Sequence, residues 1–142
     1  MAASDAPQAG QIVEHYFLWR DERAAGHVEG RKARPCLIVA VEHIGKDKQP
    51  RVAVLPITSQ APRTGPHAIA IPDDIKSRIG LDQGRPAWVV VGEANAFTWP
   101  GFDLVPQRDG NFVRGVVTRG FFINVRNAML SLKPRVVERD EE

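Results

Sequence analysis

Residues 35–58 read PCLIVAVEHIGKDKQPRVAVLPIT, and this stretch decides the fold. Two apolar runs rich in β-branched residues, 35–41 and 51–58, flank a polar segment that contains glycine and proline. Runs of this length and composition, separated by turn-forming residues, indicate two consecutive β-strands. Pro56 has no N–H to donate to a strand ladder, so the second strand is expected to end, bulge or lie at a sheet edge there. The centre of the chain is therefore predicted to be two strands with an irregularity at Pro56.

Three further strands are expected on either side of this pair. The run 11–19 (QIVEHYFLW) is apolar on both of its alternating faces, which is typical of a strand buried on much of both sides. A short alternating run at 67–71 (HAIAI) and an apolar run at 86–91 (PAWVVV) are the other two. Together these segments predict a mainly β domain of about five short antiparallel strands.

Two helices are expected beside these strands. Residues 72–80 (PDDIKSRIG) predict one or two helical turns that begin with Asp73 or Asp74 as the cap and stop at Gly80. Capping explains the two adjacent carboxylates better than a metal-dependent nuclease site does. In the last segment apolar residues recur every four positions, which is one face of a longer C-terminal helix: Val113, Val117, Phe121, Val125 and Met129.

Length and composition indicate one ordinary globular domain. The 142 residues include 19 Lys and Arg, 17 Asp and Glu, and 43% hydrophobic residues, so the net charge is only +2. A single cysteine, Cys36, excludes an intramolecular disulfide and a multi-cysteine zinc site. No apolar run approaches the ~20 residues of a membrane span, and the first residues lack the pattern of a signal peptide. A cytoplasmic protein with no membrane partner is expected.

The chain ends differ in character from its centre. Residues 1–9 are small and polar and are expected to form a disordered tail. Residues 134–142 end in the acidic run ERDEE and are expected to form a charged tail. The folded domain is accordingly predicted to span residues 10–133.

A cation and two hydroxyls stand where predicted strands end. Pro35 disfavours the α region for Arg34, so the arginine is held extended at a strand start. Thr58 and Ser59 follow Pro56 at the end of another strand. An arginine fork beside a hydroxyl can bind a phosphate or carboxylate oxygen. The alternative is structural: Arg34 pairs with an acid such as Glu93, and the hydroxyls close a turn.

Four sequence pieces occur in a characteristic order: GQIV at 10–13, KARPCLIV at 32–39, VAVLPITS at 52–59 and IGL at 79–81. In this order and at these spacings they resemble the PemK/MazF family of toxins from type II toxin-antitoxin systems. The resemblance implies a compact SH3-like β-barrel, a homodimer, and a metal-independent endoribonuclease that cleaves single-stranded mRNA without a cofactor. It also implies an antitoxin partner, which occupies the RNA groove and through which operator DNA can be bound.

The resemblance assigns the catalytic pair to Arg34 of the RP motif and Thr58 of the PIT motif, beside Ser59. In metal-free cleavage the ribose 2′-hydroxyl attacks its own phosphate, so Arg34 would neutralise charge and Thr58 would orient or donate. His27 in the first loop and His67 at a strand start are the candidate proton acceptors. His15, inside an apolar strand, is interpreted as a satisfied core residue.

Single-stranded RNA is usually held by aromatic side chains beside a basic groove. Trp19 lies near a strand end and is a candidate platform, as are Phe97 and Trp99, whereas Trp88 in its apolar run is assigned to the core. The remaining candidates for contact with the RNA backbone and groove are Arg20, Arg31, Lys32 and Glu93.

The stretch 86–101 departs from the family pattern. Ala87 stands near an expected serine, Glu93 can replace an acid, and no arginine follows before Trp99. This departure motivates an alternative function, a non-catalytic module on the same barrel that binds nucleic acid or a topoisomerase.

Overall fold

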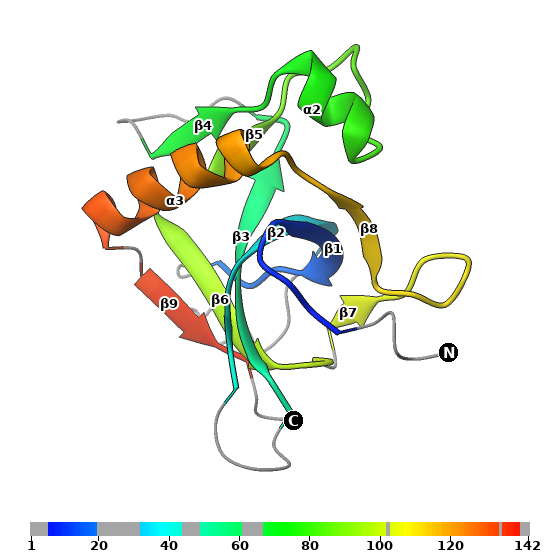
Figure 1. Ribbon diagram of the computed structural model, residues 1–142, viewed down its shortest axis with the longest axis vertical. Helices are drawn as coiled ribbons and strands as arrows, with labels where there is room; N and C mark the ends of the chain where they lie inside the picture. Colours follow the sequence, from blue (N-terminus) through cyan, green and yellow to red (C-terminus); the bar gives the residue numbers. More distant parts are fainter. Residues whose placement is uncertain are drawn as a thin grey trace.

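The structure is a computed structural model, and it describes residues 6–19, 32–43, 49–60, 67–101, 103–133 and 135–139. The described part contains nine strands and two helices (Figure 1). In chain order these are β1 Gln11–Tyr16, β2 Ala33–Glu42, β3 Arg51–Thr58, β4 Ala68–Ala70, α2 Asp73–Arg78, β5 Trp88–Val90, β6 Glu93–Thr98, β7 Leu104–Val105, β8 Val113–Val116, α3 Arg119–Leu132 and β9 Arg135–Glu138.

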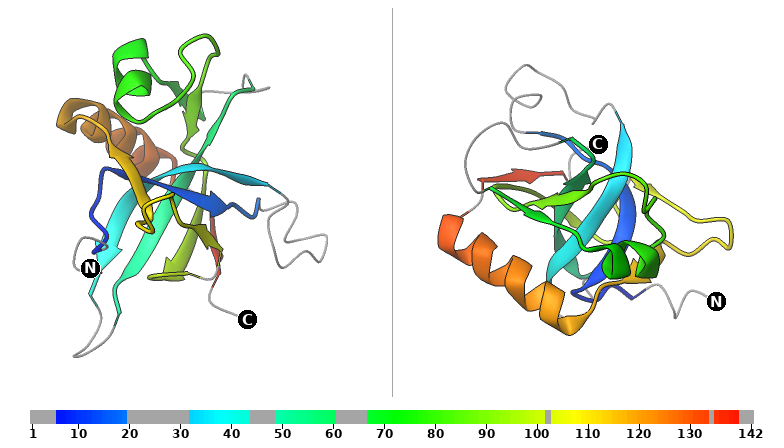
Figure 2. Two further views of the ribbon diagram at one scale, coloured as in Figure 1. Left: turned by 90° about the vertical axis from the view of Figure 1, so that its right-hand side faces the viewer. Right: turned by 90° about the horizontal axis from the view of Figure 1, so that it is seen from above.

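The prediction of a mainly β fold with one short helix and one C-terminal helix is confirmed. The five expected strands correspond to β1 to β5, and β6 to β9 come in addition. The described strands form one sheet in the order β4-β5-β3-β2-β1-β7, with β6 joined to β3, β9 joined to β6 and β8 joined to β1. The sheet curves strongly but does not close into the expected barrel (Figure 2).

Strand β3 lies at the centre of the sheet and changes partner along its length. It pairs antiparallel with β2 from Arg51 to Pro56, where Pro56 lies opposite Cys36. Beyond Pro56 it continues with β5, so that Ile57 faces Val89 in the ladder. Strand β3 thus runs through Pro56 to Thr58 and does not end there; its pairing with β2 stops at Pro56, and the register shift between the two strands falls between Ile38 and Ala40 of β2.

Side chains alternate between two apolar clusters on the two sides of β2 and β3. One side, here called the helix-side core, packs against both helices and includes Leu37, Leu55, Ile79 and Phe121. The other side, here called the aromatic core, contains nine buried residues: Val13, Phe17, Cys36, Ile38, Val52, Val54, Phe97, Trp99 and Leu104. Strands buried on both sides read as continuous apolar runs, which is the reason that 35–41 and 51–58 stand out in the sequence.

The C-terminal helix begins later than its periodic pattern suggested. Thr118 is the N-cap and its hydroxyl accepts a hydrogen bond from the Phe121 N–H. Val113–Val116, expected as the first turn of this helix, instead forms β8 and pairs with β1. Gly115 of β8 lies so close to α2 that an added Cβ would be 2.9 Å from the Ile79 Cα. Sheet pairing and this close contact override the helical spacing.

Two expectations at helix and chain ends are corrected. Helix α2 has Pro72 as its N-cap with no side-chain capping bond, and Asp73 instead pairs with Lys76 Nζ at 3.0 Å. The segment 134–142, expected as a charged tail, contains β9, which runs parallel to β6. Arg139 directly after it is 1% exposed. The sheet therefore continues past residue 133. The charged Arg139 can be buried there because it forms an ion pair with Asp103.

Candidate functional site

Arg34 and Thr58 lie at the ends of adjacent strands and on the same face of the sheet. The last pair between β2 and β3 joins Cys36 to Pro56, and Arg34 and Thr58 each lie two residues further along. Because alternate residues of a strand share a face, both extend from the side that carries Cys36 and the aromatic core. Twenty-three residues of chain separate the two, and the strand register places the cation and the hydroxyl on this one face.

The Arg34 side chain is held by aromatic contact rather than by an acid. Its guanidinium carbon is 5.3 Å from the centre of the Trp19 ring, within the range of a cation–π interaction. Trp19 in turn makes an edge-to-face contact with Phe17, with 5.1 Å between ring centres. Within the part of the chain that is described, Arg34 makes no ion pair with Glu93, so the structural alternative is not observed for this residue. Because none of the described carboxylates is paired with it, the half-buried guanidinium is available to an anion.

The Thr58 hydroxyl is half-buried and keeps its proton available. Its Oγ1 accepts a hydrogen bond from the Gln60 N–H at 3.2 Å, so it closes a small turn as the structural alternative expected. An accepting hydroxyl can still donate its own proton. Ser59 is exposed in the bend that follows. Thr58 can therefore donate to an oxygen of a bound anion while the backbone fixes its position.

Trp19 lies beside Arg34 and Trp88 lies beside Thr58, whereas the other two aromatic residues expected as stacking surfaces are buried. Trp88 lies opposite Thr58 in the β3–β5 ladder and is half-buried, although its apolar run suggested the core. Phe97 and Trp99 are 1% and 5% exposed, so they belong to the aromatic core and offer no platform. The alternation of side chains in β5 could have predicted the half-buried position of Trp88. Buried Val89 faces the helix-side core, so Trp88 next to it must face the opposite side of the sheet.

The remaining candidates differ in how the structure treats them. Glu93 is half-buried and precedes Asn95 by two residues in β6, so it shares the face of the aromatic core. Lys32 is exposed immediately before β2. Three candidates lie outside the described residues: Arg20, His27 and Arg31. His67 is exposed before β4.

Behind Arg34 lies a buried polar network that the sequence did not reveal. Asn95 is fully buried, and its Oδ1 accepts hydrogen bonds from the Leu18 N–H at 2.9 Å, from His15 Nε2 at 3.1 Å and from Arg139 Nη1 at 3.2 Å. Arg139 also donates to the Tyr16 carbonyl at 3.0 Å and forms an ion pair with buried Asp103. The network joins the end of β1 to β6 and to the last residues of the sheet.

His15 is buried within this network, as its position in an apolar strand suggested. It is 1% exposed and its ring stacks on Phe97 with 4.8 Å between centres. Burial lowers the pKa of His15 from 6.5 to about 4, against the opposing effect of the Asn95 hydrogen bond, and the positive charge of Arg139 lowers the pKa further. At neutral pH His15 is therefore an uncharged imidazole.

The cysteine next to this site is no accessible nucleophile. Cys36 is fully buried, and burial raises the pKa of its thiol far above the ordinary value although the charge of Arg34 opposes the rise. Its sulfur is therefore no nucleophile at neutral pH. Among the described residues no group of three His, Cys, Asp or Glu side chains could hold a metal ion.

None of the described helices is long and apolar enough to cross a membrane.

Fold and site together define a small mainly β protein that presents a cation and a hydroxyl on one face of a curved sheet, with Trp19 beside the cation and Trp88 opposite the hydroxyl in the strand ladder. The family profile described as PemK-like, MazF-like toxin of type II toxin-antitoxin system matches residues 10–97, which include Arg34, Thr58 and Trp88. The chain belongs to this family, as its motifs suggested. Proteins of the family are the toxins of toxin-antitoxin pairs, so an antitoxin partner follows. No individual curated protein matches the chain significantly.

Proposed function

We propose that this protein is the toxin of a type II toxin-antitoxin system and a metal-independent endoribonuclease that cleaves single-stranded mRNA. The observation that carries the proposal is the placement of Arg34 and Thr58 on one sheet face, each two residues beyond the last β2–β3 pair of Cys36 and Pro56. Family membership supports the class of protein. The site supports the proposed RNA cleavage, because Arg34 offers a cation and Thr58 a hydrogen-bond donor for a phosphate. The reaction needs no nucleophile from the protein.

In the proposed reaction the nucleophile is the 2′-hydroxyl of the RNA itself. This oxygen attacks the adjacent phosphorus, the bond from phosphorus to the 5′-oxygen of the next nucleotide breaks, and charge accumulates on the non-bridging oxygens. The Arg34 guanidinium would neutralise that charge, and the Thr58 hydroxyl would donate to one of the same oxygens. His27 is proposed as the acceptor of the 2′-proton and Ser59 as a second donor.

The flanking tryptophans suggest how the RNA would be held. One Trp19 face is already occupied by Arg34, so Trp88 beside Thr58 is the better stacking surface for a base, and Trp19 serves chiefly to hold the arginine. Lys32, Arg20 and Arg31 are proposed to contact backbone phosphates, and Glu93 to contact the groove. The antitoxin would cover the same face. A homodimer and indirect operator DNA binding, both implied by the family, are part of the proposal.

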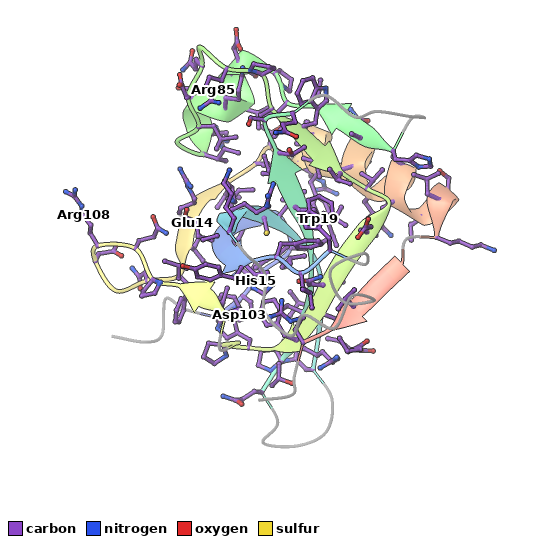
Figure 3. All side chains as sticks on the ribbon, turned by 180° about the vertical axis from the view of Figure 1, so that it is seen from behind. Glu14, His15, Trp19, Arg85, Asp103 and Arg108 are labelled. Atoms are coloured by element: carbon purple, nitrogen blue, oxygen red, sulfur yellow. The ribbon has the colours of Figure 1, made fainter. Side chains whose placement is uncertain are left out.

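The test is cleavage of a long single-stranded RNA in EDTA by wild type, Arg34→Ala and Thr58→Val at matched salt. Removal of one donor that stabilises transition-state charge typically costs ~10²–10³ in rate, and Arg34→Ala should fall in that range. Arg108→Ala is the matched control, because Arg108 is exposed at the tip of the loop between β7 and β8 and points away from Trp19 and His15 (Figure 3). Equal cleavage by Arg34→Ala and wild type would refute the proposal. RNA bound but left intact by folded wild type would favour the non-catalytic binding module.

A further inference from the structure

Two buried polar atoms beside the proposed catalytic centre are complementary. His15 and Arg34 lie directly opposite each other in the antiparallel pair of β1 and β2. His15 Nδ1 and Arg34 Nε are both buried, and neither has a hydrogen-bond partner among the residues that the structure describes. Directly opposed side chains on one face of a sheet have Cβ atoms only about 5 Å apart. The structure contains no direct hydrogen bond between the two atoms, so one bridging water or a small side-chain rotation would connect them.

The hydrogen-bond pattern determines which of the two atoms donates. The orientation of the Asn95 amide follows from Leu18, because Nδ2 donates to the Leu18 carbonyl at 2.8 Å and Oδ1 accepts from the Leu18 N–H at 2.9 Å. The Oδ1 that meets His15 Nε2 is an acceptor, so Nε2 must carry the imidazole hydrogen. In the neutral ring Nδ1 is then an acceptor, whereas an arginine Nε–H can only donate.

The charges around His15 favour this neutral ring. Arg34 faces it from β2 and Arg139 from the end of β9, while Asp103, before β7, is ion-paired with Arg139. Glu14, its neighbour in β1, is engaged with Arg114 at 3.7 Å. A protonated His15 would place a third positive charge between two guanidinium groups in a buried site, which is unfavourable.

We propose that His15 is a positioning residue for Arg34, and that its Nδ1 accepts a hydrogen bond from the Arg34 Nε–H through one buried water or after a small rotation of the side chains. Trp19 covers the face of the guanidinium while His15 holds its Nε edge, and the two Nη groups are left for the phosphate. Asn95 acts one step further back, because it selects the imidazole tautomer. The expected effect of this contact on the rate of RNA cleavage rests on the proposed ribonuclease function.

The kinetic test compares two substitutions that each keep one half of the imidazole's bonding. His15→Gln places an amide nitrogen near the position of Nε2 and keeps the bond to Asn95, but removes the acceptor at Nδ1. His15→Asn places an amide oxygen near the position of Nδ1 and keeps that acceptor, but loses the bond to Asn95. We expect kcat to fall about tenfold in His15→Gln with KM unchanged, and about twofold in His15→Asn.

Stability should rank the same two variants in the opposite order. His15→Asn leaves a larger gap beside Phe97 and an unpaired Asn95 oxygen, so it should unfold at lower urea concentration than His15→Gln. A purely structural role for His15 would make activity follow stability. Activity that follows stability, or a kcat of His15→Gln equal to that of wild type, would overturn the proposal.

A measurement on the wild-type protein tests the contact without cleavage or a variant. Nitrogen-15 NMR at pH 7 should show the Arg34 Nε–H protected from solvent exchange and His15 with its proton on Nε2 and a hydrogen-bonded Nδ1. Rapid exchange at Arg34 Nε, or a proton on Nδ1, would overturn the contact. If the NMR result is as expected while wild type leaves RNA intact, the ribonuclease function fails and the contact stands.

Discussion

Acidification should destabilise this protein through one buried histidine. The pKa of His15 lies at about 4 in the folded protein, against 6.5 for the ordinary side chain. Between these values the unfolded chain binds a proton that the folded protein does not, so stability falls as the pH falls from 6.5 towards 4. One pKa unit corresponds to about 1.4 kcal/mol, so about 3 kcal/mol of unfolding free energy depends on pH in this window.

The assay is urea unfolding of wild type and His15→Gln at pH 7 and at pH 4. Glutamine does not titrate, while the other histidines and the carboxylates are common to both proteins and cancel in the comparison. Wild type should lose about 3 kcal/mol more than His15→Gln between the two pH values. Equal losses in the two proteins would refute the reasoning, since His15 would then titrate alike in the folded and unfolded chains.

Three further predictions concern packing and burial. Arg139→Met should lower the unfolding free energy by about 3–5 kcal/mol in urea titrations, because it leaves a buried carboxylate without its partner. Gly115→Ala should lower the free energy of unfolding by about 1–3 kcal/mol, since its new Cβ would lie 2.9 Å from the Ile79 Cα. Gly120→Ala meets open space in α3 and should raise the free energy of unfolding by about 0.5 kcal/mol. Thermal unfolding should therefore show opposite shifts for the two variants. Cys36 should react with a thiol reagent at pH 8 only at the rate of unfolding, and rapid labelling of the native protein would contradict its burial.

The fold was predictable where apolar runs are long. Strand β3 coincides with the run 51–58, and β2 overlaps the run 35–41, because strands buried on both sides leave a continuous apolar signal. Strands β6 to β9 were missed: β7, β8 and β9 have only two to four residues each, and β6 (EANAFT) contains no run of β-branched residues. The strand β8 was even assigned to the C-terminal helix, as four-residue spacing cannot reveal that Val113 pairs across the sheet with β1.

The site was predictable only as far as its motifs reach. Arg34 and Thr58 were assigned from the RP and PIT motifs, and the strand register brings them to one face of the sheet. Trp88 was assigned to the core because its neighbours are apolar, although strand alternation turns it towards Thr58. Arg139, in a segment that reads as an acidic tail, is instead one of the most buried side chains.

The sequence by itself determined the class of fold, the family and the two residues proposed for catalysis, because apolar runs and short motifs are local properties of the chain. Only the tertiary structure decided what surrounds them. Asn95 meets His15 across 80 residues of sequence, and Arg139 meets Tyr16 across 123. The buried polar residues of this protein find their hydrogen-bond partners on elements that are distant in sequence, and a local sequence pattern cannot predict those contacts.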